Sequence, residues 1–313
     1  MRFNPKARID SGKVSDAGRG SGGGGLGGLG GGSRLPIPSG LGGGKIGLVV
    51  VVIFFLVAMC TGNVPGINQG DGSGGTQNNA TGSDAQAQQE ADAYDECQTG
   101  EDANNSEKCA RQAILQMLET FWASQFPNGD FVAAPARTFQ GSTTTGCGNA
   151  TSAVGPFYCP ADKTIYLDPT FFDDVLEGQL GGKGGDFVEP YVLGHEYGHH
   201  IQNITGQMRN VKTQQGADSD AVKLELQADC YAGLWTHHIE SIKDSEGQQI
   251  LTIDDADIKE AIDAAYTVGD DHIQEVTGGR VDANQWTHGS SEERMKWFRT
   301  GYESGDFDAC NVW

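Results

Sequence analysis

The sequence predicts an α+β fold in which helices dominate and a small β-sheet contributes. Apolar residues recur at helical spacing in several segments after residue 93, whereas only residues 163–168 have the composition of a clear strand. The sequence before residue 93 is mostly of low complexity and offers little for a core. We therefore expect one folded domain over residues 93–313, and its length of about 220 residues suits a single domain.

Three regions are expected before this domain. Residues 1–45 are rich in Gly and Ser with scattered basic residues, which predicts a disordered tail. Residues 46–64 begin with an uncharged apolar run, and its neutral neighbours extend it towards the roughly 20 residues of a transmembrane helix. Residues 65–92 are rich in Gly, Asn, Gln, Ser, Asp and Ala and are expected to form a flexible linker.

The apolar run has three interpretations. A buried core helix fits poorly, because low-complexity sequence flanks the run on both sides. A cleaved signal peptide is the stronger alternative, but a long charged region precedes the run and no small-x-small cleavage site follows it. We therefore expect an uncleaved, single-pass anchor in the cell membrane. Because the positive charge lies before the run, the N-terminus is expected in the cytoplasm and the domain outside.

The charge of the chain limits its partners. The formal net charge is −21, and residues 1–60 carry seven basic residues against two acidic ones. The rest of the chain is therefore even more acidic than the whole. Because an acidic domain repels phosphate, we do not expect nucleic acid to be a partner.

Six cysteines follow residue 60, and an even number suggests disulfides in an exported domain. The two local pairs, each closing a loop of about a dozen residues, are expected first: Cys97 with Cys109 and Cys147 with Cys159. Cys230 and Cys310 either pair or stay reduced. The sequence alone leaves the connectivity open.

The elements of the domain follow from the spacing of apolar residues and the position of turn residues. Helices are expected over 107–125, 171–176, 186–202, 218–241, 255–268 and 291–302, and a strand over 163–168.

A metal-binding pattern lies within the helix expected over 186–202. His195 and His199 are four residues apart, so both imidazoles lie on one face and can reach the same ion. Glu196 lies between them, where its carboxylate can accept a proton from a metal-activated water. The alternative is two hydrogen-bonded histidines on a buried helix. The apolar lead-in over 187–193 and a ligand-supplying segment downstream favour the metal.

The downstream segment lies in the helix expected over 218–241. A catalytic zinc ion requires three protein ligands and one open position. Glu225 lies in an otherwise apolar stretch about one turn before Asp229, and buried carboxylates are costly unless paired or metal-bound. We expect Glu225 to be the third ligand, and Asp229 to hold the far nitrogen of a zinc-bound histidine. Two solvated acids on an exposed face are the alternative.

The remaining histidines have weaker cases. His200 follows the second ligand directly and points about 100° away around the helix, so we expect it to be packed or exposed. His237 and His238 lie too far along their helix from Glu225 to share its metal. His288 precedes the last helix and could stabilise an oxyanion. A structural loop histidine is the alternative at that position.

At these motifs the sequence resembles the bacterial family of putative neutral zinc metallopeptidases. The resemblance covers residues 1–10, 155–162, 165–168, 195–202, 224–230 and 287–291. It implies a zincin-like metallopeptidase domain that binds zinc and follows a short basic segment and a single membrane span.

The order of the motifs also resembles the membrane-bound CAAX-processing and heat-shock zinc proteases. In those proteases the first Glu of the second motif binds zinc, which implies the same role for Glu225. Their Thr-His is followed by Pro, whereas Gly289 follows His288 here. This departure leaves the role of His288 open.

These residues predict zinc-dependent hydrolysis of peptide bonds in a protein or peptide substrate. Residues 163–168 are expected to form the edge strand that aligns the substrate, as in zincins. One alternative is a zinc-binding, non-catalytic scaffold anchored in the membrane, against which the intact Glu196 argues. Another is a membrane-tethered structural protein, which leaves Glu196 and Glu225 unexplained. The sequence does not specify the substrate or the oligomeric state.

Overall fold

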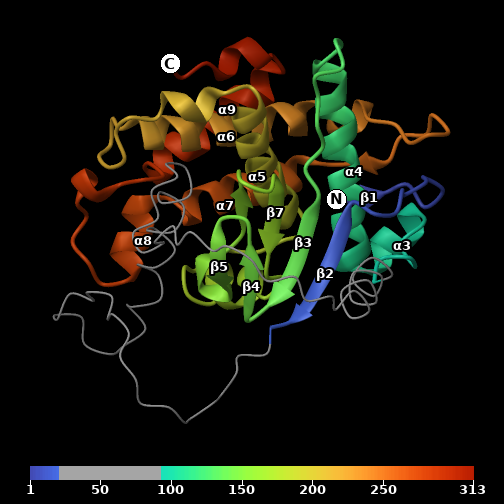
Figure 1. Ribbon diagram of the computed structural model, residues 1–313, viewed down its shortest axis with the longest axis horizontal. Helices are drawn as coiled ribbons and strands as arrows, with labels where there is room; N and C mark the ends of the chain where they lie inside the picture. Colours follow the sequence, from blue (N-terminus) through green and yellow to red (C-terminus); the bar gives the residue numbers. More distant parts are fainter. Residues whose placement is uncertain (21–92) are drawn as a thin grey trace, which may run out of the picture.

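The computed structural model describes residues 1–20 and 93–313 (Figure 1). The described residues form a helix-rich α+β domain with small sheets, and the core is built around the long helices. The helices are α3 (Gly100–Asn105), α4 (Glu107–Gln125), α5 (Val188–Ile204), α6 (Asp220–His238), α7 (Asp255–Thr267), α8 (Asp270–Val276) and α9 (Ser291–Ser304). A π-helical turn, η2 (Phe172–Glu177), replaces the short helix expected over 171–176.

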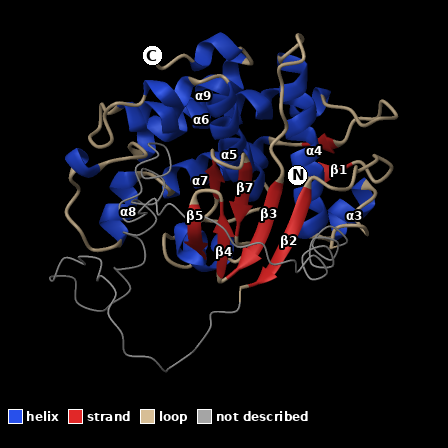
Figure 2. Cartoon of the chain, viewed as in Figure 1, coloured by secondary structure: helices blue, strands red, loops and turns tan. Residues whose placement is uncertain are grey.

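The main sheet has the strand order β2-β3-β7-β6, and Figure 2 shows β3 between β2 and β7. The first three strands, β2 (Val14–Arg19), β3 (Ala136–Gln140) and β7 (Thr164–Leu167), run parallel. The fourth strand, β6 (Phe157–Cys159), is antiparallel to β7. The expectation that residues 163–168 form the edge is therefore wrong, because β7 lies between two partners and β6 forms the edge beside it.

Two smaller sheets complete the strands of the described chain. In one, β1 (Arg2–Phe3) pairs with β8 (Leu251–Thr252). In the other, β4 (Ser142–Thr145) pairs with β5 (Gly148–Thr151) as a hairpin. The first of these sheets joins the N-terminal segment to a much later part of the chain, because Arg2 and Thr252 lie 250 residues apart.

The first twenty residues belong to the domain, so the predicted disordered tail over 1–45 is wrong for this part. β1 and β2 each pair with a strand of the later chain. Four apolar side chains of the segment are buried in the main core: Phe3, Ala7, Ile9 and Val14. Their irregular spacing hid this role, because it matches neither a helical nor a strand period over enough residues.

The predicted transmembrane helix over 46–64 and the predicted linker over 65–92 lie outside the described residues. Within residues 1–20 and 93–313, no helix combines the length and apolar character that a membrane span needs. These two parts share one sheet and one core. The predicted fold class, with a disordered tail and one span ahead of a separate domain, is therefore wrong in that residues 1–20 form part of this domain.

Glycines allow the central helices to approach closely. A Cβ on Gly198 of α5 would lie 3.1 Å from the Cα of Ala228 on α6. A Cβ on Gly301 of α9 would lie 2.0 Å from the carbonyl oxygen of Cys230, again on α6. Gly198 is therefore present because another helix approaches it, which offsets the cost of glycine in a helix interior.

Three disulfides link segments of the described chain. Both expected local pairs are present, and the two remaining cysteines also pair: Cys97–Cys109, Cys147–Cys159 and Cys230–Cys310. The third disulfide ties α6 to the short turn η6 (Phe307–Cys310) near the C-terminus.

Asp244 joins the loop before β8 to the N-terminal segment. Its carboxylate accepts hydrogen bonds from the backbone N–H groups of Arg8 at 2.7 Å, Gln248 at 2.8 Å and Glu246 at 2.9 Å. Burial by itself would raise the pKa of Asp244, but these donors outweigh burial and lower it. The ionised carboxylate therefore stabilises the folded state.

We expect Asp244→Asn to lower the free energy of unfolding at pH 7 by about 1–3 kcal/mol, because charge-assisted hydrogen bonds are lost. The folded-state pKa lies below the unfolded value, so this contribution is present above the unfolded pKa of about 3.9. It disappears as the pH falls through the folded-state pKa. Chemical denaturation of both proteins across this pH range measures the difference. The exposed Asp130→Asn is the control, and a difference that persists at the lowest pH would contradict the assignment.

Candidate metal centre

Three side chains with metal-binding atoms meet between α5 and α6. Nε2 of His195 lies 3.2 Å from Oε2 of Glu225, and Nε2 of His199 lies 3.4 Å from Oε1 of the same carboxylate. One ligand atom from each residue lies within 4.8 Å of the other two. All three residues are buried. The structure therefore brings together the three residues that the sequence predicts as ligands.

This set of donors fits zinc. Two imidazole nitrogens and one carboxylate oxygen are three protein ligands, and a catalytic zinc site leaves its fourth position open. Burial opposes the ionised form of Glu225, but His199 and His195 outweigh burial and lower the pKa of Glu225 well below its usual value. The carboxylate is therefore in the ionised form that a cation requires.

Asp229 supports His195 from behind. Its Oδ1 lies 2.8 Å from Nδ1 of His195 and accepts a 2.7 Å hydrogen bond from the hydroxyl of Tyr191. Arg294 of α9 donates to both oxygens, at 2.8 Å and 3.0 Å. Burial opposes ionisation, but Arg294 and His195 lower the pKa of Asp229 to about 2. A permanent negative charge thus holds Nδ1, so Nε2 of His195 faces the cluster.

His199 is oriented by an amide. Oε1 of Gln202 lies 2.8 Å from Nδ1 of His199. The Gln202 amide nitrogen donates to the carbonyl of Leu224 at 2.7 Å and to Oε1 of Gln227 at 3.1 Å, which fixes the direction of the amide. Gln202 and Arg294 are not among the site residues that the sequence predicts. The spacing of Gln202, three residues after His199 on one helix face, was an available signal, whereas Arg294 gave none.

Glu196 lies beside the cluster with one oxygen unused. Burial raises the pKa of Glu196, and the charges of His195 and His199 only partly offset this effect. The backbone of Tyr158 in β6 donates a hydrogen bond to the carboxylate. Oε2 is buried and has no hydrogen-bond partner among residues 1–20 and 93–313. A buried carboxylate oxygen without a hydrogen bond costs free energy, unless a water molecule or a substrate group donates a hydrogen bond to it.

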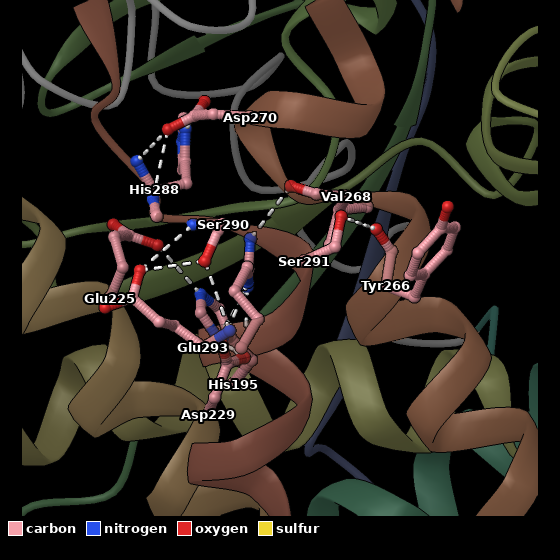
Figure 3. A network of polar contacts seen from close by, with 12 residues as sticks. His195, Glu225, Asp229, Tyr266, Val268, Asp270, His288, Ser290, Ser291 and Glu293 are labelled. Carbon is pink, nitrogen blue, oxygen red and sulfur yellow. Dashed lines mark hydrogen bonds and ion pairs between the residues drawn. The ribbon is translucent and has the colours of Figure 1, made fainter. Parts of the chain in front are cut away.

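His288 reaches the same region from the turn before α9 (Figure 3). Asp270, the first residue of α8, accepts the backbone N–H groups of Thr287, His288 and Gly289 at 2.7, 2.7 and 3.0 Å. Oδ1 of Asp270 also lies 3.2 Å from Nδ1 of His288. Burial opposes the imidazolium, but the charges of Asp270 and then Glu225 raise the pKa of His288. With Nδ1 engaged, Nε2 is the nitrogen available to a ligand.

The other histidines do not join the cluster. His200 is fully buried, and both of its ring nitrogens contact groups outside the cluster. Its Nδ1 lies 3.0 Å from the hydroxyl of Tyr158 and its Nε2 lies 2.5 Å from the carbonyl of Val132. Burial lowers the pKa of His200 to about 4. His237 and His238 contact backbone carbonyls near the end of α9.

Comparisons with known proteins agree with this arrangement. All residues, 1–313, match the family described as "Putative neutral zinc metallopeptidase". An uncharacterized protein of Mycobacterium tuberculosis is 46% identical over 220 residues, which are 69% of this chain and 74% of the relative. The uncharacterized protein YpfJ of Escherichia coli is 35% identical over 317 residues, covering 98% of this chain and 97% of the relative. No solved structure matches the chain.

We expect Asp229→Asn to weaken zinc binding about 10- to 100-fold, because the substitution keeps the shape but removes the charge that orients His195. Competition against a chelating dye measures the affinity. Asp130→Asn removes an exposed charge and serves as the control. An Asp229→Asn protein that is folded and binds zinc as tightly as the wild type would contradict this role.

Proposed function

The chain belongs to the family described as putative neutral zinc metallopeptidases, and from this premise we propose that it hydrolyses peptide bonds with zinc held by His195, His199 and Glu225. The observation that carries the proposal is the buried, unpartnered oxygen of Glu196 beside these ligands. A purely structural zinc site has no use for such a base.

Glu196 is the proton carrier of the proposed reaction. Zinc in this site would supply Lewis acidity that lowers the pKa of a water towards about 7. The carboxylate of Glu196 accepts a proton from the attacking water and then delivers it to the leaving amine. A pKa raised by burial suits both transfers, because the group must take up the proton and release it within one turnover.

His288 is the proposed donor to the oxyanion. Its Nε2 is available towards the region of Glu225, while Asp270 fixes its backbone and its Nδ1. A donor held in place before the reaction stabilises charge that develops on the substrate carbonyl oxygen. Asp270 is a positioning residue that acts through the imidazole, because its carboxylate is hydrogen-bonded to the backbone of the turn around His288 and to the His288 ring.

Strand β6 is the proposed support for an extended substrate. It is an edge of the main sheet, and the backbone of Tyr158 contacts Glu196. The hydroxyl of Tyr158 is held by His200 and by a 2.9 Å hydrogen bond from Asn203, both on α5. A peptide added to this edge would run beside the base, with main-chain hydrogen bonds providing affinity.

The proposed site of action is an oxidising compartment. Three disulfides, most of whose cysteines are buried, support this proposal. Disulfides are rare in proteins of the reducing cytosol.

We expect Glu196→Gln to retain zinc and lose about 10²- to 10⁴-fold in kcat on a peptide library, because the proton carrier is removed and the ligands are not. Metal analysis and peptidase assays are made on the same preparation, with the exposed Glu303→Gln as the control. Undiminished peptidase activity would refute Glu196 as the base. A wild-type protein that binds zinc but cleaves no peptide would instead indicate a non-catalytic zinc protein.

We expect His288→Gln to lower kcat about 10²- to 10³-fold with little change in KM or zinc content, because the interaction forms mainly in the transition state. Asp270→Asn should lower kcat less, since the imidazole remains but loses its orientation. Steady-state kinetics separate the two parameters, and the exposed His237→Gln is the control. Loss of zinc in His288→Gln would assign this residue to metal binding instead.

A further inference from the structure

The N-terminal segment, residues 1–19, lies on the domain as a bound peptide would. We propose that residues 93–313 carry a second peptide-binding groove, distinct from the metal centre, and that its occupant is residues 1–19 of the same chain. The groove is defined by Asn104, Gln112, Gln116 and Asp244 together with the edge of β3. Its existence does not depend on the proposed peptidase activity.

Side-chain amides of the groove hold the backbone of the segment. Asn104 accepts the N–H of Phe3 at 3.0 Å and donates to the carbonyl of the same residue at 2.9 Å. Gln116 accepts the N–H of Asp10 at 2.7 Å and donates to the carbonyl of Arg8 at 3.2 Å. A carboxamide offers both a donor and an acceptor, so each one can satisfy two backbone groups of an extended peptide.

The same pattern continues along α4. Gln112 accepts the N–H of Val14 at 3.0 Å and donates to the carbonyl of Asp10. Beyond this point β2 pairs with β3, so the segment is bound by backbone hydrogen bonds along most of its length. Backbone contacts of this kind provide affinity in peptide recognition by strand addition.

Apolar side chains provide the specificity of the docking. Phe3, Ala7 and Ile9 are buried, whereas the intervening Lys6 and Arg8 are exposed. Phe3 also lines a cavity of about 490 Å³. A groove that buries selected side chains and leaves the others in water distinguishes its occupant from an arbitrary extended chain.

The docked segment reaches the helix that carries the metal-binding histidines. The ammonium group of Met1 lies 2.8 Å from Oδ1 of Asp186, just before α5, and 2.6 Å from Oδ1 of Asp257 on α7. Val188 and Leu193 of α5 line the same cavity as Phe3. Occupation of the groove therefore supports the start of α5. The coupling of docking to zinc affinity rests on the proposed ligand set, whereas the docking itself does not.

The length of chain between segment and domain favours an occupant from the same molecule. Residues 21–92 join the two parts, so they remain tethered when the segment leaves the groove. A tether converts docking into an intramolecular event and raises the local concentration of the segment. In the alternative, the segment of a second copy of the chain occupies the groove, and the test below detects this outcome.

The test cuts the tether in the folded, full-length protein. A protease recognition sequence is inserted after Gly25, so that cleavage releases a short fragment without the apolar run over 46–60. We expect the fragment to co-elute with the rest of the chain in size-exclusion chromatography, at the mass of one chain. Excess synthetic peptide of residues 1–19 should displace it. Subsequent removal of the peptide by extensive dialysis, which leaves the groove empty, should weaken zinc binding, measured by chelator competition.

Matched variants test the groove itself. Phe3→Asp in the competing peptide should weaken displacement more than about tenfold, because a buried ring is replaced by a charge. Gln116→Leu in the full-length chain should speed release of the fragment. Lys6→Asp in the peptide changes an exposed residue and should compete as the wild-type peptide does.

Three results would overturn the proposal. The first is immediate release of the fragment with unchanged thermal stability. The second is equal competition by the Phe3→Asp and wild-type peptides. The third is an uncut protein that elutes as a dimer and exchanges labelled segments between copies, which would assign the groove to a second chain. Retention of the fragment in a protein without peptidase activity would support the groove and refute only the proposed function.

Discussion

The buried ion pair between Asp229 on α6 and Arg294 on α9 is the contact on which the metal centre depends. The guanidinium keeps the buried carboxylate ionised, and the carboxylate in turn fixes Nδ1 of His195. Removing either partner would leave an uncompensated buried charge. Close contact between α6 and α9, made possible by Gly301, places the two charged groups together. The packing of three helices thus sets the orientation of one imidazole.

Three acidic residues in this small region have different environments, and these differences assign their roles. Glu225 and Asp229 are surrounded by cationic or hydrogen-bonding partners that lower their pKa values. Burial dominates at Glu196 and raises its pKa, while one of its oxygens has no partner among the described residues. Two carboxylates are therefore suited to hold charge, and the third is suited to exchange a proton.

The edge of the main sheet and the N-terminal segment both contact α5, and they hold this helix in position from two sides. Tyr158 of β6 contacts α5 through His200 and Asn203, close to the metal-binding turn. Met1 contacts Asp186 just before the first turn of α5. A helix held at both places keeps its polar side chains in register with those of α6. This explains how a domain with small sheets can support a well-ordered cluster.

Local patterns in the sequence determined the long helices and the ligand set, because the spacing of four between His195 and His199 is a property of the helix itself. The choice of Glu225 followed from the cost of an acid in an apolar stretch. Asp270 and Arg294 depended on tertiary structure, since each acts on a residue of another element. The same holds for β2, whose partner strand lies more than 100 residues away. Composition suggested a disordered tail, whereas long-range pairing decided that its first residues complete the domain.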